Sequence, residues 1–149
     1  MDEEKLVRFL NQELSNFTVL YIKLHRYHWY IQGKNFFTLH AYFEDLYRSF
    51  SKQMDVLAER ILAIGGRPLA TMSKFLDQKT LVEASADNEE GELLQQLRED
   101  LAQLAKEIRE TGIPLAEESK DNATVNLLTR FLIRFDKDIW MLDAMADKR

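Results

Sequence analysis

Hydrophobic residues recur along the chain with the three- and four-residue spacing of amphipathic helices. Two such stretches run from about Glu4 to Ile31 and from about Phe36 to Ile64, a third begins near Glu89 or Glu90, and a fourth follows Asp121. The apolar positions of these stretches include Leu10, Leu14, Phe17, Tyr21 and Leu24, then Phe43, Tyr47, Phe50, Met54, Leu57 and Ile61, then Leu93, Leu97, Leu101, Leu104 and Ile108, and finally Leu128, Leu132, Phe135, Ile139 and Leu142. The pattern predicts four long helices.

The links between these stretches differ in length. Gln32–Asn35 separates the first stretch from the second, and Gly65 and Gly66 end the second stretch. Residues 67–88 form a long connection with room for a short helix around Thr71 to Leu76. Short, long and short links predict an all-α, ferritin-like four-helix bundle with one long crossover between its second and third helices. Pro114 should kink or break the third helix near its end. The 149 residues are expected to form one domain, 1–149.

The composition narrows the class of protein. Hydrophobic residues make up 46% and charged residues 30%, as in globular proteins, and no apolar run approaches the roughly 18 residues that a membrane span needs. The acidic start Met1–Lys5 lacks the basic and apolar segments of a signal peptide. Because there is no cysteine, disulfides and thiolate metal sites are excluded. We therefore expect a cytoplasmic protein without a membrane partner.

The net charge of −5 bears on the partners. Lys and Arg residues are scattered along the chain, whereas duplex binding draws much of its affinity from clustered phosphate contacts. The charge balance thus argues against autonomous DNA binding and favours a positively charged partner, such as a metal cation.

Five residues with metal-binding side chains stand out: His28, His40, Glu44, Asp55 and Glu59. His40 with Glu44, and Asp55 with Glu59, are i, i+4 pairs, so each pair projects from one side of the second helix. On a helical wheel these four fall roughly 60° to 160° from the apolar stripe, on one flank beside the core. Imidazole and carboxylate together suit iron, zinc or manganese.

The distance between the two pairs excludes a single centre within one chain. Glu44 and Asp55 are eleven residues apart, or about 16 Å along a helix. An antiparallel copy of the same helix would bring Asp55 and Glu59 of one chain towards His40 and Glu44 of the other, and a two-fold interface makes two such sites. The alternatives are a solvated helix face for the pairs and a satisfied core histidine for His28.

The chain resembles the Dps family of ferritins over nearly its whole length. The residues that carry the resemblance are Leu24-His25-Arg26-Tyr27-His28-Trp29-Tyr30, Gly33, Asn35-Phe36-Phe37-Thr38-Leu39-His40, Phe43-Glu44-Asp45-Leu46-Tyr47, Asp55, Ala58-Glu59-Arg60-Ile61, Ile64-Gly65-Gly66, Asp121-Asn122-Ala123-Thr124 and Trp140-Met141-Leu142. The resemblance implies a ferroxidase in a hollow dodecamer, which oxidises ferrous iron, preferentially with hydrogen peroxide, and stores the ferric mineral as protection against oxidative damage.

The resemblance also assigns roles to residues. It places a mono-iron or di-iron centre at the two-fold subunit interface, with His28, His40, Glu44, Asp55 and Glu59 as catalytic metal ligands. Glu44 departs from the Asp that is common at its position in the family. Three further residues have an implied role beside a structural one. Trp29 would intercept oxidising equivalents or pack as an aromatic at the interface, and His25 would be a surface residue near the ligands. Asp121 would line a pore or act as the N-cap of the fourth helix.

Two other functions compete with iron oxidation. Many members of the family compact DNA in the nucleoid, generally through a mobile basic tail, but here the N-terminus is acidic and Asp147–Arg149 is short. The second alternative is a purely structural bundle that uses the polar flank as a dimer interface. Burying His and carboxylate groups there without a metal would be unfavourable, which argues against this alternative.

Overall fold

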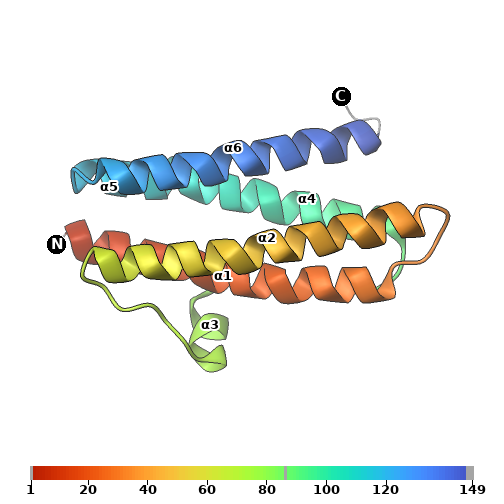
Figure 1. Ribbon diagram of the computed structural model, residues 1–149, viewed down its shortest axis with the longest axis horizontal. Coiled ribbons are helices and arrows are strands. Elements are labelled where there is room, and N and C mark those ends of the chain that lie inside the picture. The colour runs from red at the N-terminus through yellow and green to blue at the C-terminus, as the bar shows by residue number, and fades with distance from the viewer. Residues whose placement is uncertain (1, 86, 147–149) are drawn as a thin grey trace.

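The computed structural model describes residues 2–85 and 87–146. In this part of the chain the long helices form two antiparallel hairpins that pack side by side (Figure 1). A short helix belongs to neither hairpin and lies beside the first one. The helices are α1 (Asp2–Tyr30), α2 (Phe36–Ala63), α3 (Met72–Gln78), α4 (Glu90–Glu107), α5 (Ile113–Glu118) and α6 (Asn122–Met145). The predicted all-α bundle with one long crossover is confirmed, and the observed ends differ from the predicted ones by one or two residues.

The core lies where the two hairpins meet. Phe17 of α1 is fully buried, and its ring meets Phe50 of α2 and Phe131 and Phe135 of α6 edge-on, with centroids 5.2, 5.3 and 6.0 Å apart. Edge-to-face packing at these distances is favourable beyond the burial of area. The predicted apolar stripes therefore converge on one aromatic centre that fixes α1, α2 and α6 relative to one another.

The third long helix continues past Pro114, so the break that the sequence allowed does not occur, but the regular α-helix is interrupted just before the proline. After α4, residues Ile108–Gly112 form a π-helical segment, η1, and α5 continues directly from it. A wider π turn accommodates a residue that has no N–H to donate. Gly112 permits the close packing here, because a Cβ at that position would lie 2.4 Å from the ring of Phe9.

The crossover between α2 and α4 is fastened to α1 by side chains of two asparagines. Asn11 donates to the carbonyl of Arg67 at 3.0 Å and accepts from the N–H of Leu69 at 2.9 Å. Asn16 Oδ1 accepts from the N–H groups of Thr80 and Leu81 at 2.8 and 3.0 Å. These bonds satisfy backbone groups of the crossover that lie outside helices. Because they flank α3, they hold α3 against α1.

Side-chain caps define the starts of two helices. Thr71 accepts from the N–H of Lys74 at the start of α3, and Asp121 accepts from the N–H of Thr124 at the start of α6. The predicted short helix is thus confirmed with its N-cap at Thr71, and Asp121 is confirmed as an N-cap. Within the described residues, no helix is both long enough and apolar enough to span a membrane.

Candidate metal centre

Two histidines face each other where α1 ends and α2 begins. The rings of His28 and His40 are stacked, with 3.6 Å between centroids and 14° between planes. His28 Nδ1 donates to the carbonyl of His40 at 2.7 Å, and His40 Nδ1 donates to the carbonyl of His28 at 2.8 Å. Gly33, at φ 126°, allows the tight reversal that brings the two residues together.

This reciprocal bonding sets the chemistry of both rings. A carbonyl oxygen only accepts, so each Nδ1 must carry a proton, and a neutral ring then has its lone pair on Nε2. Metal-binding histidines are oriented in the same way, with the second ring nitrogen donating to a carbonyl. His28 is buried, with 8% of its surface exposed, so its orientation is set by packing as well.

Glu44 lies next to this pair, one helical turn after His40. Its Oε1 is 3.8 Å from His28 Nε2, so an imidazole nitrogen and a carboxylate oxygen face the same space. Its Oε2 accepts from Arg48 Nε at 3.1 Å and lies 3.0 Å from Arg48 Nη2. The structure therefore places His28 beside both His40 and Glu44.

Asp55 and Glu59 lie elsewhere. Both are exposed and belong to the second half of α2, whereas His40 and Glu44 belong to its first half. Among the described residues of one chain, no three His, Asp or Glu side chains gather closely enough to hold a metal ion. The five predicted ligands thus form two separate groups on one chain.

Aromatic rings surround the histidine pair. His25 stacks on Tyr47 at 3.7 Å, Tyr47 meets His28 edge-on at 5.4 Å, and Trp29 lies 5.4 Å from His25. His25 Nδ1 donates to the carbonyl of Tyr21 at 2.8 Å, and its ring packs between those of Tyr47 and Trp29. Trp29 is 67% exposed.

Two neighbours of the centre were not found from the sequence. Arg48 follows Glu44 by four residues, and this i, i+4 spacing was a usable signal for the ion pair. Phe36 stacks on His40 at 4.9 Å, and its i, i+4 spacing before His40 was likewise a usable signal. Asp121, the candidate pore residue, pairs with Arg60 Nη2 at 2.8 Å as well as capping α6.

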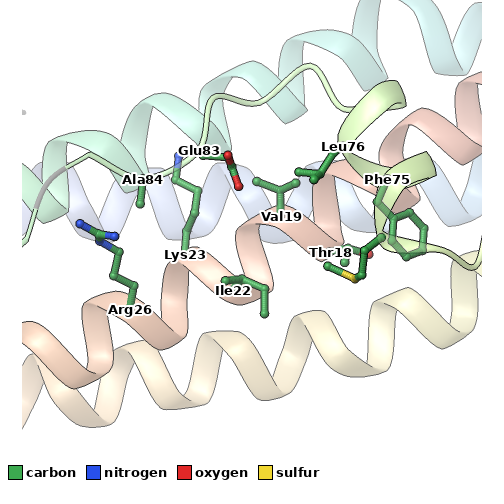
Figure 2. A pocket seen from close by; sticks show the side chains of 10 residues that line it. Thr18, Val19, Ile22, Lys23, Arg26, Phe75, Leu76, Glu83 and Ala84 are labelled. Atoms are coloured by element: carbon green, nitrogen blue, oxygen red, sulfur yellow. The ribbon is translucent and has the colours of Figure 1, made fainter.

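A mainly apolar groove lies between α1 and α3. It has a volume of about 320 Å³, and Figure 2 shows Leu76 and Phe75 of α3 beside Val19 and Ile22 of α1. Ile22, Met72 and Leu76 are 54%, 60% and 46% exposed. Contiguous exposed apolar side chains of this kind mark interaction surfaces.

Comparison with known proteins identifies the class. The family model of the ferritin-like domain matches residues 7–149. The crystal structure of a Dps protein from Bacillus brevis superposes with a TM-score of 0.94 at 36% identity, covering 97% of each chain. A Dps protein from Vibrio cholerae O1, described as a member of a broad superfamily of ferritin-like diiron-carboxylate proteins, superposes with a TM-score of 0.93 at 34% identity, covering 97% of this chain and 91% of that one. The fold and the matches define a ferritin-like helical-bundle protein.

Relatives of similar sequence define the family within this class. General stress protein 20U of Bacillus subtilis (strain 168) is 40% identical over 141 residues, which are 95% of this chain and 97% of that protein. The DNA protection during starvation protein of Listeria monocytogenes is 41% identical over 143 residues, which are 94% of this chain and 90% of that protein. The chain belongs to the Dps family.

Proposed function

We propose that this protein is a ferroxidase and iron-storage protein, whose active centre is completed by the carboxylates of a second subunit. The observation that carries the proposal is the His28–His40 pair, with both Nδ1 atoms engaged in hydrogen bonds and Glu44 beside the pair. Ferrous iron is the substrate and the ferric mineral is the stored product.

The donor set fits iron. Neutral imidazole nitrogens and carboxylate oxygens are ligands for ferrous iron, and carboxylates stabilise the more highly charged ferric product. His28 and His40 supply the nitrogens and Glu44 supplies an oxygen through Oε1, because Oε2 is bonded to Arg48. One or two irons can be held, depending on how many further carboxylates the partner brings.

The second group of ligands comes from another copy of the chain in this proposal. Asp55 and Glu59 are exposed on the same helix, so a two-fold axis that sets two α2 helices antiparallel would place them opposite His40 and Glu44. The exposed apolar groove between α1 and α3 supports such an interface, because covering Ile22, Met72 and Leu76 would remove apolar area from water.

Three finer features of the proposal come from the family resemblance. They are a hollow dodecamer, hydrogen peroxide as the preferred oxidant, and acidic pores that admit cations. Consuming peroxide together with ferrous iron would suppress hydroxyl-radical chemistry and so protect the cell. The absence of cysteine agrees with the cytoplasm as the proposed compartment.

Mixed oligomers provide the test. One variant lacks the nitrogen ligands (His28→Asn with His40→Asn), and the other lacks the partner carboxylates (Asp55→Asn with Glu59→Gln). Each variant alone should oxidise iron no faster than buffer. After unfolding and joint refolding in equal amounts, half of the dimers are mixed and each holds one complete site, so about a quarter of the wild-type activity should return.

The readout is ferric absorption in the near ultraviolet after anaerobic ferrous loading and a peroxide pulse. Recovery near a quarter supports a shared centre. If the carboxylate-deficient variant alone keeps wild-type activity, the centre lies within one chain and the proposal is wrong. If the wild type also matches buffer, the ferroxidase function fails altogether.

DNA compaction is the second candidate function, and the name of the Listeria relative is the observation that favours it. The net charge of −5 opposes it, because phosphate neutralisation needs clustered cations. The terminal residues Asp147–Arg149 lie outside the described part of the chain. A gel shift at low salt separates the candidates: we expect no retarded duplex, whereas a salt-sensitive shift would support DNA binding.

A further inference from the structure

A pair of carboxyl groups lies between α1 and the end of α4, far along α1 from the histidines. Glu13 is fully buried, although a carboxylate in that position normally needs a cation. The amide of Asn16 donates to Glu13 Oε2 at 3.3 Å and to Glu107 Oε1 at 3.2 Å. The amide of Gln12 reaches the same two oxygens at 3.4 Å each, so the two carboxyls are immediate neighbours.

If both groups were carboxylates, the pair would lack a hydrogen-bond donor that its buried oxygens need. Glu13 Oε1 is buried and has no hydrogen-bond partner, whereas Glu107 Oε2 accepts from Thr80 Oγ1 at 2.7 Å and from Gln103 at 3.1 Å. A buried acceptor without a donor is unfavourable, and two adjacent negative charges are more so. One proton on the pair removes both problems, because a protonated carboxyl donates where a carboxylate can only accept.

The charged groups on the neighbouring elements do not supply a counter-ion. Lys79 of the crossover donates to the carbonyl of Leu81, and Arg109 of η1 pairs with Asp136 of α6. On α3, Asp77 accepts from Gln78. Of the described titratable groups, Glu107 is the one that acts on Glu13: burial first, then hydrogen bonding and repulsion from Glu107, raise the pKa of Glu13 well above its usual value.

We propose that Glu13 and Glu107 share one proton and form a pH-sensitive latch that fastens the crossover to the bundle. Asn16 connects the two parts of the latch. Its Nδ2 bonds both carboxyls and Thr80 Oγ1, while its Oδ1 holds the N–H groups of Thr80 and Leu81. Loss of the shared proton leaves two adjacent negative charges. Their repulsion separates the carboxyls that Asn16 bridges, which loosens the hold of Asn16 on the crossover.

The crossover carries α3, so the latch acts on the apolar groove. Met72 and Leu76 of α3 line that groove, and α3 is held to α1 partly through Asn16. Because the folded-state pKa of Glu13 is raised, the stabilisation is fully present below the unfolded value of about 4.3 and is lost as the pH rises through the folded value. The latch is independent of iron, so it stands apart from the ferroxidase proposal.

Hydrogen exchange of the full-length protein tests the latch directly, because the N–H groups of Thr80 and Leu81 are bonds that it holds. Mass spectrometry of peptides covering both residues, corrected for intrinsic exchange rates, should show at least about tenfold loss of protection between about pH 5 and about pH 9. Glu13→Gln should keep protection across that range, because an amide nitrogen in place of Oε1 donates as the protonated acid does.

Three controls make the outcome decisive. Glu110→Gln removes an exposed carboxylate on η1 and should follow the wild type. If Glu13→Gln does not fold, Glu107→Gln is the second variant: it removes the charge beside Glu13, so the loss of protection with rising pH should be smaller than in the wild type, although its amide nitrogen gives up a bond that Glu107 accepts. Wild-type protection that is independent of pH, or a variant at Glu13 that follows the wild type, overturns the latch. Protection that rises with added magnesium at fixed pH overturns it too, because a cation rather than a proton would then fill the pair.

Discussion

Lys23 of α1 and Asp100 of α4 form an ion pair inside the bundle, with 2.6 Å between Nζ and Oδ2. Both side chains are buried, and Lys23 Nζ also donates to the carbonyl of Val82 at 2.6 Å. Burial raises the pKa of Asp100, although Lys23 opposes this shift. The interior between α1 and α4 is thus occupied by a lysine, and the histidines proposed as ligands lie instead at the α1–α2 turn.

Removing one partner of this ion pair should destabilise the protein strongly. Lys23→Met leaves Asp100 buried without its cation, for which we expect a loss of about 3–5 kcal/mol. Lys23→Met with Asp100→Leu should recover most of that loss, because no uncompensated charge remains. Chemical denaturation of the three proteins checks this; a double variant no more stable than the single one would contradict the explanation.

His28→Asn should separate the fold from metal binding. The asparagine Nδ2 can take over the hydrogen bond from His28 Nδ1 to the carbonyl of His40, so stability should change by about 1 kcal/mol. No group replaces Nε2, so affinity for Co²⁺, read by its visible absorption, should fall by more than about tenfold, or roughly 1.4 kcal/mol. Unchanged Co²⁺ affinity would remove His28 from the proposed ligand set.

Gly112→Ala should destabilise the π-helical segment. A Cβ there would lie 2.4 and 2.6 Å from two atoms of the Phe9 ring, which is held in the core, so we expect a loss of about 1–3 kcal/mol. Gly91→Ala is the matched control, since its Cβ would meet only the flexible side chain of Glu89 at 3.1 Å in the first turn of α4. That control should be neutral or slightly stabilising in thermal unfolding. Equal effects at both positions would contradict the packing argument.

Asp121 should contribute stability that depends on pH. Partial burial on its own raises the pKa of Asp121, but hydrogen bonds from Thr124 and the charge of Arg60 outweigh it and lower the pKa below the usual value. A lowered folded-state pKa contributes stability above the unfolded value of about 3.9, and this stability is lost as the pH falls through the folded value. Asp121→Asn keeps the cap without the charge, so its deficit in melting temperature should shrink from about pH 6 to about pH 3.

Asp121→Ala is the comparison for that measurement. It removes the cap as well as the charge, and loss of an N-cap costs about 0.5–2 kcal/mol at any pH. Its deficit should therefore persist at low pH. Because both variants lack the charge, both deficits should shrink by a similar amount towards pH 3, and the alanine deficit should level off at the contribution of the cap. If neither deficit shrinks, the carboxylate charge is not the source of the effect.

Local sequence signals were sufficient to predict the helices. The apolar period and Asp121 before α6 each act within a few residues, and the structure confirms the elements that they predict. The π turn before Pro114 was not predictable in this way. Its last residue, Gly112, packs against the ring of Phe9, which lies about a hundred residues earlier in the chain and is a contact that local sequence signals do not report.

The sequence proposed residues for the candidate centre but did not give their geometry. Spacing placed His40 beside Glu44, yet the stacking of His28 on His40 depends on the path of the α1–α2 turn. The buried polar groups of α1 gave no signal. Glu13 and Lys23 have the appearance of solvent-facing residues in the sequence, and only the crossover and α4 remove them from water.

The reciprocal hydrogen bonds of His28 and His40 make the length of the α1–α2 turn part of the metal chemistry. Inserting or deleting one residue between Ile31 and Asn35 would change the path of the turn that sets His40 opposite His28. Each ring would then lose the carbonyl that fixes its tautomer, although every ligand would still be present in the sequence. A chain with all five ligands but a turn of another length would therefore be a poor candidate for the same chemistry.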